Sequence, residues 1–277
     1  MPELPEVETV RTHIAPHLTG RRIERAVILD PRLVRPFEPE IVAGELQGER
    51  VSAVERRGKY LIVRFDSGRV LLIHLRMTGS LRHAPRGSVD GDAHRRAVLS
   101  MDNGSDVVYR DVRRFGTWEL LEPADVAPYL ASRLGPEPLD GLTAAALGSR
   151  LAGRRAPLKA ALLDQRTVAG LGNIYVDEAL WHARLHPLRP AGSLDANEVR
   201  RLHRAVRLAL RLGIERQGAS LRDYALPDGA SGSMQDEFRA YGREGEPCDR
   251  CGSPLAKIRV AGRGTWFCPA CQQAPAG

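Results

Sequence analysis

The sequence predicts an α+β multidomain chain, and three features of its pattern point to that class. Short β-rich runs occupy residues 23–121, helical periodicity dominates residues 143–217, and two Cys-x-x-Cys pairs lie near the C-terminus. Strands and helices do not alternate, so the β-rich part is expected to be an antiparallel sandwich or barrel preceded by one helix. We therefore expect an N-terminal β-sandwich, a helical domain and a C-terminal four-cysteine zinc ribbon.

The run Leu134–Leu139 interrupts both periodicities, because it holds two prolines and a glycine within six residues. A segment of this composition favours a semi-rigid linker. The predicted organisation is a β-sandwich domain over residues 1–133, a linker over 134–141, a helical domain over 142–240 and a zinc ribbon over 241–277.

Composition limits the class of protein. The chain has 277 residues and an excess of 41 Lys+Arg over 34 Asp+Glu, which gives a formal net charge of +7. A basic surface favours a polyanion such as nucleic acid, although an ordinary basic enzyme carries a similar charge. The start is acidic and lacks an apolar core, and no apolar run reaches about 18 residues. We expect a cytoplasmic chain with no signal peptide and no membrane association.

The first residues, Met1-Pro2-Glu3-Leu4-Pro5-Glu6, suggest a nucleophile. The small residue after Met1 permits its removal, which would leave Pro2 as a free secondary amine beside Glu3. An α-amino group titrates at about 7.7–8.0, against about 10.4 for lysine, so it is more often unprotonated near neutral pH. Such amines form Schiff bases with carbonyl-like carbons. Taken alone, these residues are more often an ordinary helix start.

The N-terminal half shows a helix and then strands. Pro5 fits a first helical turn, and Val7, Val10 and Ile14 repeat along one face. Residues 59–65 and 69–75 flank Asp-Ser-Gly and predict a hairpin. Further predictions are a turn at 102–104, strands at 106–109 and 117–121, and an exposed loop at 84–95.

Three places in this half carry residues that suit contact with nucleic acid. Lys59 follows Gly58 at the head of a strand, Met77 ends another, and Arg114-Phe115 pairs a cation with an aromatic ring. Proteins that kink DNA insert apolar side chains between base steps while arginines hold phosphates. Each residue taken singly is also compatible with an ordinary solvated or core position.

Helical patterns dominate the second half. Thr143 can cap a helix through Leu151, a short helix is expected at 158–164, and residues 198–216 place apolar residues on one face and arginines on the other. Between them, Gly170 and Gly172 precede Asn173 in a helix–turn–helix pattern. Tight glycine turns allow backbone N–H groups to approach a phosphate, which the following helix N-terminus also favours.

The end of the chain carries the most specific chemical pattern. Four cysteines are spaced C-x2-C-x16-C-x2-C, at positions Cys248, Cys251, Cys268 and Cys271. This is zinc-ribbon spacing, and four thiolates leave no open position, so a single Zn2+ here would be structural. Residues 255–260 and 265–267 predict a hairpin with Arg263 at its tip.

Taken together, these motifs resemble the bacterial formamidopyrimidine-DNA glycosylases, also called 8-oxoguanine DNA glycosylases. The resemblance covers the whole chain. Its motifs are PELPEVETVR at 2–11, RRGKYL at 56–61, HLRMTGSL at 74–81, RRFG at 113–116, LGPEPL at 134–139, LLDQRTVAGLGNIYVDEALW at 162–181, YGREGEPC at 241–248 and GRGTWFCPACQ at 262–272.

The resemblance implies a bifunctional base-excision-repair enzyme that binds double-stranded DNA, flips out an oxidised purine and removes it. Pro2 would attack C1′ to form a Schiff base, and Glu3 would protonate the opening sugar ring. Strand cleavage by β,δ-elimination would follow. Flipping costs a few kcal/mol of stacking.

The resemblance also assigns roles to individual residues. Lys59 would act near the lesion and its phosphates, and Glu6 would help to order the pocket. The residues assigned to DNA contacts are His74, Met77, Arg114, Phe115, Lys159, Asn173 and Arg263. The helical domain would be of the helix-two-turn-helix type with a lesion-covering loop, and the chain would act as a monomer.

Two departures from the family pattern concern specificity. Val112 stands where many members have a proline before RRFG, and residues 228–234 replace a bulkier lesion-covering segment. The alternatives are an enzyme of the related Nei type, which prefers oxidised pyrimidines, and a damaged-DNA-binding protein without activity. The start PELPEVE differs from the PEGPE of the Nei type, and the presence of Pro2, Glu3 and Lys59 disfavours a non-catalytic protein.

Overall fold

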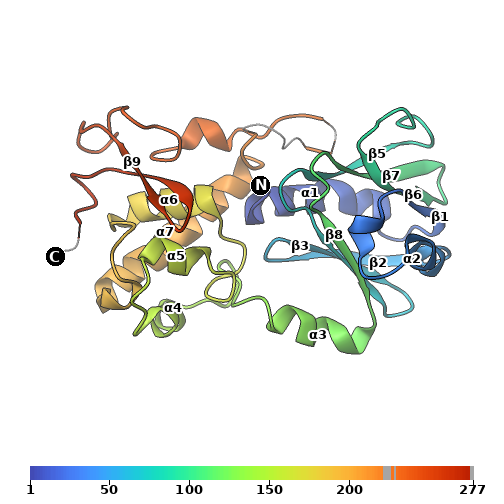
Figure 1. The fold of residues 1–277 in the computed structure, drawn as a ribbon, viewed down its shortest axis with the longest axis horizontal. Helices are drawn as coiled ribbons and strands as arrows, with labels where there is room; N and C mark the ends of the chain where they lie inside the picture. The colour runs from blue at the N-terminus through green and yellow to red at the C-terminus, as the bar shows by residue number, and fades with distance from the viewer. Residues whose placement is uncertain (221–225, 228, 275–277) are drawn as a thin grey trace. The chain divides into compact units, whose positions relative to one another are not determined.

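The structure is a computed structural model that describes residues 1–220, 226–227 and 229–274 (Figure 1). It divides into two compact units. Unit 1 contains residues 1–130 and 217–233, and unit 2 contains residues 131–216 and 234–277.

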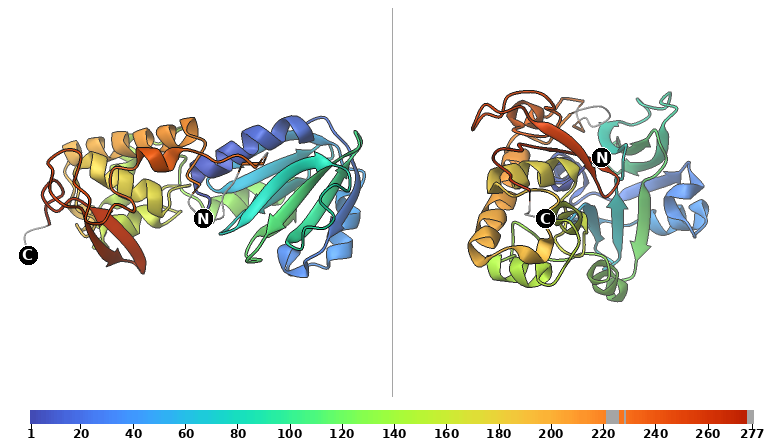
Figure 2. Two further views of the ribbon diagram at one scale, coloured as in Figure 1. Left: turned by 90° about the horizontal axis from the view of Figure 1, so that it is seen from above. Right: turned by 60° about the vertical axis from the view of Figure 1, so that its left-hand side comes forward.

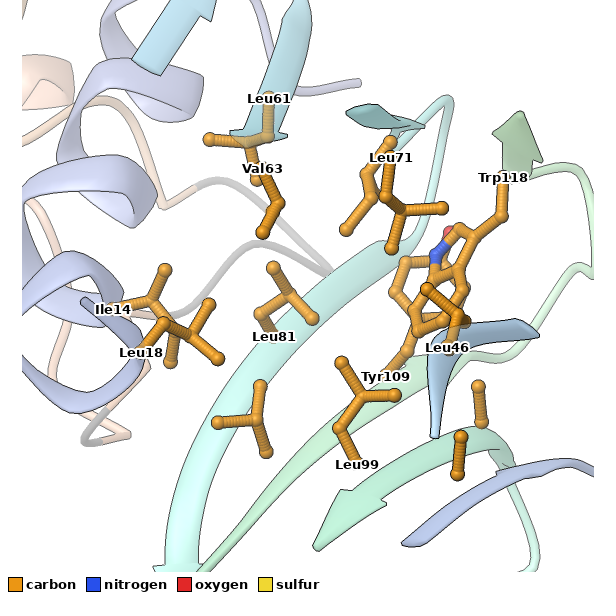
Figure 3. Packing of buried hydrophobic residues seen from close by; sticks show 14 of the residues in the cluster. Ile14, Leu18, Leu46, Leu61, Val63, Leu71, Leu81, Leu99, Tyr109 and Trp118 are labelled. Atoms are coloured by element: carbon orange, nitrogen blue, oxygen red, sulfur yellow. The ribbon is translucent and has the colours of Figure 1, made fainter. Parts of the chain in front are cut away.

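Unit 1 is built on two antiparallel sheets, each with four strands in the described residues. One sheet has the order β1-β6-β7-β5 and the other the order β2-β3-β4-β8. Their bounds are β1 Ile23–Ile28, β2 Val51–Arg57, β3 Tyr60–Phe65, β4 Val70–His74, β5 Gly79–Pro85, β6 Arg95–Met101, β7 Ser105–Asp111 and β8 Thr117–Leu121. Side chains from both sheets share one apolar core, so the predicted sandwich is confirmed (Figures 2 and 3).

Helix α1, Leu4–Leu18, packs against this sandwich. Its buried face includes the predicted Val7, Val10 and Ile14, together with Leu18. Figure 3 shows Ile14 and Leu18 facing Leu81 of β5. The catalytic residues proposed for the N-terminus therefore directly precede a helix that is buried from its first turn.

The predicted β-elements are largely confirmed. The hairpin forms between β3 and β4, a turn at 102–104 joins β6 to β7, and β8 has the predicted bounds. The loop expected at 84–95 is shorter, because β5 extends to Pro85 and β6 begins at Arg95. The connection is also tied by ion pairs, including Arg110 Nε to Asp92 Oδ2 at 2.9 Å.

Short helical elements in and after unit 1 were not predicted. They are the 3-10 helices η1, Pro31–Val34, and η3, Met234–Glu237, and the α-helices α2, Pro39–Leu46, and α3, Pro123–Ala131. Both α-helices begin with a proline and span nine residues or fewer. Such short stretches show too few turns for a helical period to stand out from neighbouring strands.

Unit 2 contains the predicted helices. They are α4 Ala144–Leu151, α5 Leu158–Leu163, α6 Asn173–Ala183 and α7 Ala196–Glu215, with the 3-10 helix η2 at Ala191–Ser193. The Thr143 hydroxyl accepts a hydrogen bond from the Ala146 N–H, as its predicted capping role requires. Helix α7 packs on α4 and α6, and the predicted apolar residues Val199, Leu202, Val206, Ala209 and Gly213 are buried.

The C-terminal hairpin is formed by β9, Ala256–Val260, and β10, Arg263–Phe267. The turn is shorter than predicted: it consists of Ala261 and Gly262, with φ of 48° and 74°. Two successive positive φ values define the turn that suits the right-handed twist of a hairpin. Arg263 is therefore the first residue of β10, paired with Val260, rather than the tip. No helix among the described residues has both the length and the hydropathy needed to span a membrane.

Candidate functional site

The N-terminus is held by a carboxylate that joins two distant segments. Pro2 and Glu3 are buried directly before α1. One oxygen of Glu6, Oε2, accepts the Glu3 N–H at 2.8 Å, and Oε1 accepts the Ala219 N–H at 2.9 Å. At Gly218, with φ of 80°, a Cβ would lie 2.7 Å from Glu6 Cγ. Glu6 thus fixes the nucleophile candidate to residues 218–219 rather than touching the reacting atoms.

Lys59 lies in the turn between β2 and β3, next to Tyr60, which pairs with His74 of β4. The turn before Lys59 needs Gly58, whose φ is 57°, and the Arg56 guanidinium donates to the Gly58 carbonyl at 3.0 Å. Lys59 is 5% exposed, and its positive charge disfavours protonation of His74. Burial, followed by Arg76 and Lys59, lowers the pKa of His74 to about 3. His74 is therefore neutral at physiological pH and accepts the Arg76 N–H at Nδ1, at 3.0 Å.

A buried carboxylate links the turn of Met77 to the turn of Arg114. Asp111 Oδ1 accepts a hydrogen bond from the Thr78 hydroxyl, next to half-buried Met77. The same carboxylate accepts the N–H groups of Arg113, at 3.2 Å, and Gly116, at 2.8 Å. The two turns that were predicted to enter DNA are thus fixed to one another, and sequence reasoning missed the residue that does this.

The two side chains at the second turn point in different directions. Phe115 is 51% exposed, and the Arg113 guanidinium lies over its ring at 4.8 Å from the centroid. Arg114, with φ of 60°, instead donates two hydrogen bonds to Asp30, from Nε at 2.5 Å and from Nη2 at 2.8 Å. Phe115 is therefore available as a wedge, and Arg114 is oriented by a carboxylate that the sequence did not single out.

Gly116 is required by the packing below this turn. A Cβ at Gly116 would lie 1.7 Å from the hydroxyl oxygen of buried Tyr109. The same oxygen lies 2.3 Å from the Cβ position of Gly79. Any larger residue at either glycine would displace the Tyr109 ring, which packs edge-on against Trp118 (Figure 3).

In unit 2, Asn173 and Lys159 meet at one carbonyl of the zinc hairpin. Asn173 Nδ2 donates to the Gly264 carbonyl at 3.0 Å, and Lys159 Nζ donates to it at 2.9 Å. Asn173 is the first residue of α6 and directly follows Gly172, and a helix N-terminus favours an anion. That arrangement suits the predicted phosphate contact.

Lys159 was predicted to contact the DNA backbone, and its burial contradicts this. Its side chain is 0% exposed and forms an ion pair with Asp177 Oδ1 at 2.7 Å. Burial raises the pKa of Asp177, which Lys159 opposes, while Asp177 Oδ2 accepts the Trp266 N–H at 3.1 Å. A second buried carboxylate, Glu178, accepts three successive N–H groups from residues 239–241. Lys159 therefore joins α5, α6 and β10.

The four cysteines converge on one point. Their sulfur atoms all lie within 4.8 Å of one another, with Cys251 Sγ and Cys268 Sγ 3.5 Å apart. A tetrahedral zinc with Zn–S bonds of about 2.3 Å places its sulfurs about 3.8 Å apart. Among the described residues, this is the cluster that fits a metal ion, and its closed four-thiolate set fits one structural Zn2+.

Comparison with known proteins identifies the family. The formamidopyrimidine-DNA glycosylase of Symbiobacterium thermophilum is 48% identical over 284 residues, covering 100% of this chain and 91% of that protein. The chain belongs to the formamidopyrimidine-DNA glycosylase family. Family models match its N-terminal domain at residues 1–118, its H2TH domain at 134–225 and the zinc finger found in FPG and IleRS at 245–274. The predicted family and fold class are therefore confirmed.

Solved structures of family members agree with this assignment. A complex of a Lactococcus lactis FPG variant with DNA containing Fapy-dG has a TM-score of 0.92 and 40% identity, covering 99% of this chain and 100% of that one. The complex of the Lactococcus lactis Fpg with abasic-site DNA has a TM-score of 0.92 and 39% identity, covering 98% and 100%. MutM bound to DNA with carbocyclic 8-oxo-G has a TM-score of 0.91 and 40% identity, covering 99% and 100%.

The lesion-covering segment that the family resemblance placed at 228–234 is described only in part. Asp228 lies outside the described residues. Gly232 donates its N–H to the Ser220 hydroxyl at 3.0 Å, and Ser233 bridges to Ala219. A Cβ at Gly232 would lie 2.3 Å from the Gly218 carbonyl oxygen, so this part of the segment requires glycine. Gly232 and Ser233 therefore lie beside Gly218 and Ala219, the residues that contact Glu6.

Proposed function

We propose that this chain is a bifunctional DNA glycosylase and AP lyase that uses Pro2 as its nucleophile. One observation carries the proposal: Pro2 and Glu3 are buried at the start of α1, where Glu6 fixes them to residues 218–219. Burial and the positive end of the helix both disfavour a protonated amine there. After removal of Met1, Pro2 would present a neutral amine at a fixed position.

The proposed reaction forms and breaks one bond at a time. The Pro2 nitrogen attacks C1′ of the damaged nucleotide, the bond between C1′ and the base breaks, and the base departs with the proton that the Pro2 nitrogen loses. Glu3 donates a proton to the sugar ring oxygen as the ring opens, which leaves an iminium on Pro2. Loss of a C2′ proton then expels the 3′ phosphate, and a second elimination expels the 5′ phosphate.

Other residues of unit 1 support this chemistry without taking part in bond formation. Lys59 supplies a buried positive charge near the neutral His74, which suits a phosphate or the developing charge on the sugar. Met77 and Phe115 fill the space that the extruded base leaves, because their turns are fixed together by Asp111. Asn173 and Arg263 in unit 2 bind phosphates that flank the lesion.

The proposed substrate is double-stranded DNA with an oxidised purine or an abasic site. Family members have been solved on DNA containing Fapy-dG, carbocyclic 8-oxo-G and an abasic site. A further complex of the Lactococcus lactis protein holds DNA with an oxidised pyrimidine, so that base class is the second candidate. We place the enzyme in the bacterial cytoplasm, with the nucleoid DNA, acting as a monomer.

Borohydride trapping tests the nucleophile and the lesion together. The chain without Met1 is incubated with duplexes carrying 8-oxoguanine opposite cytosine, an oxidised pyrimidine, or an abasic site. An adduct on the first and last duplexes that maps to Pro2 is expected, with a Pro5→Ala variant as the matched proline control. Retention of Met1 should abolish the adduct while binding persists. An adduct at another residue, or undiminished cutting with Met1 present, would overturn the role of Pro2.

A further inference from the structure

A groove in unit 2 lies between α4 and the start of α7, and η2 contributes to its lining (Figure 1). Its volume is about 520 Å³, within the range of about 300–1,000 Å³ that is usual for binding sites. Apart from Ser149 and Arg200, the described residues that line it are alanine, glycine, leucine and valine. None of them has a role in the proposed reaction, so the groove needs an explanation of its own.

Gly148 lies inside α4 and forms part of the wall of the groove. Its φ is not in the left-handed region that favours glycine. A Cβ at Gly148 would meet the described atoms of Val199 at 3.4 and 3.8 Å, which is ordinary van der Waals contact. Glycine weakens a helix interior relative to alanine. Gly148 therefore weakens α4 and widens the groove, and no contact with a described residue accounts for it.

The charge beside the groove is positive. Arg200 lines it, and Arg204, one turn further along the same side of α7, is exposed. Neither arginine forms an ion pair with a described residue. The acids at this end of α7 are already bound: the Asp195 carboxylate accepts the Glu198 N–H at 2.8 Å, and Glu198 pairs with Arg189. The groove thus combines an apolar wall with two arginines that can accept a carboxylate partner.

We propose that this groove is a docking site for a short acidic segment of another protein that also carries apolar side chains. The apolar side chains pack on Gly148 and Val199 and leave water, as they do where a segment lies in a groove between helices. The carboxylates bind Arg200 and Arg204, because a guanidinium donates two parallel hydrogen bonds to a carboxylate. Duplex DNA is a poorer match, since its phosphates gain nothing from an apolar wall. The proposal does not depend on the role given to Pro2.

A display selection on the whole chain tests the proposal. Phage that carry short random peptides are selected on the immobilised chain in the absence of DNA. The most enriched peptide is synthesised with a fluorescent label, and its Kd is measured by polarisation for the wild type, Gly148→Ala, Gly148→Leu and Arg200→Glu. Arg211→Glu is the matched control, because Arg211 is an exposed arginine of α7 that is absent from the described lining of the groove.

The enriched peptides should hold more aspartate, glutamate and apolar residues than the starting library. Arg200→Glu should weaken binding of the labelled peptide about tenfold, the scale of one hydrogen bond between charged groups, and Arg211→Glu should leave it unchanged. Gly148→Leu should weaken binding at least as much, because its side chain occupies the groove. Gly148→Ala should raise the Tm, since alanine favours a helix, and still weaken binding by a smaller factor. A glycine with a purely structural role would not separate these two effects.

A selection that enriches no peptide, or peptides without acidic residues, would overturn the proposal. So would a Kd that is unchanged in both Gly148→Leu and Arg200→Glu. Two other occupants have their own signatures, and either would replace the proposed partner. Weaker binding of undamaged duplex DNA in Arg200→Glu but not in Gly148→Leu would assign the surface to DNA. A concentration-dependent dimer that Gly148→Leu dissociates would assign the groove to a second copy of this chain.

Discussion

The two lysines that the structure buries differ in what surrounds them. Lys59, in unit 1, lies at a β-turn beside a neutral histidine, on a sandwich whose core is continuous and apolar. Lys159, in unit 2, is fully enclosed and bound to Asp177 and to the Gly264 carbonyl. We propose a role in the chemistry for Lys59, whereas Lys159 joins α5, α6 and β10 within unit 2.

The same contrast extends to the two units. In unit 1, Glu6 and Asp111 accept hydrogen bonds from the segments proposed to act on DNA, and the sandwich beneath has a continuous apolar core. In unit 2, the apolar cluster beneath the zinc hairpin is small and consists chiefly of Trp181, Leu255 and cysteine side chains. The contacts around it are two buried carboxylates, a buried ion pair and the predicted zinc site. The helices of unit 2 also bury apolar side chains, among them Leu147, Leu180 and Leu202. We therefore expect the zinc hairpin to depend on charge and metal, whereas the rest of both units depends on packing.

Removal of zinc should have the largest effect and should be confined to unit 2. Metal binding contributes on the order of 10–16 kcal/mol in zinc-finger peptides, more than so small a cluster can replace. Chelation, or Cys268→Ser, should therefore abolish hydrogen-exchange protection of β9 and β10 and leave β6 and β7 protected. Restoring zinc after chelation is the control. Equal loss of protection in both sheets would contradict the contrast between the units.

Loss of the buried ion pair should have the next largest effect. Lys159→Met strands Asp177 in the interior, and breaking such a pair by removing one partner costs about 3–5 kcal/mol. Lys257→Met is the matched control, because Lys257 is 43% exposed and pairs with Glu244 at 3.2 Å at the surface. That change should cost less than about 1 kcal/mol. Denaturant unfolding followed by hydrogen exchange of β10 measures both, and equal costs would refute the structural role of Lys159.

Overpacking substitutions in unit 1 should lower the free energy of unfolding by less, because neighbouring side chains of a continuous core can shift to accommodate them. Gly116→Ala places a methyl group 1.7 Å from the Tyr109 oxygen, and overpacking of this kind costs about 1–3 kcal/mol. The Tyr109 oxygen has no hydrogen-bond partner among the described residues, so Tyr109→Phe should be nearly neutral. Combined with Gly116→Ala, it should recover part of the loss. Thermal unfolding of the four proteins checks this, and strictly additive costs would contradict the predicted clash.

The sequence correctly predicted those features that depend on residues close together in the chain. The cysteine spacing, the Thr143 cap and the apolar face of α7 each depend on residues within one or two turns. Partners far apart in the chain left no such signal. Lys159 has the sequence pattern of a surface lysine, and only the structure shows that it is buried in an ion pair with Asp177. Asp30 gave no signal either, because its partner Arg114 is 84 positions away in the chain. The hairpin turn was misplaced because Ala261 adopts a positive φ that its residue type does not favour.

The last prediction concerns His74 and is measured as a dependence of stability on pH. Its folded pKa of about 3 lies below the ordinary value of 6.5, so between these values the unfolded chain binds a proton that the folded chain does not. Stability from this residue should therefore fall as pH decreases from about 6 to 4, by about 1.4 kcal/mol per pH unit. His74→Gln should flatten that slope, as denaturant unfolding at several pH values would measure. Parallel slopes in the two proteins would contradict the lowered pKa of His74.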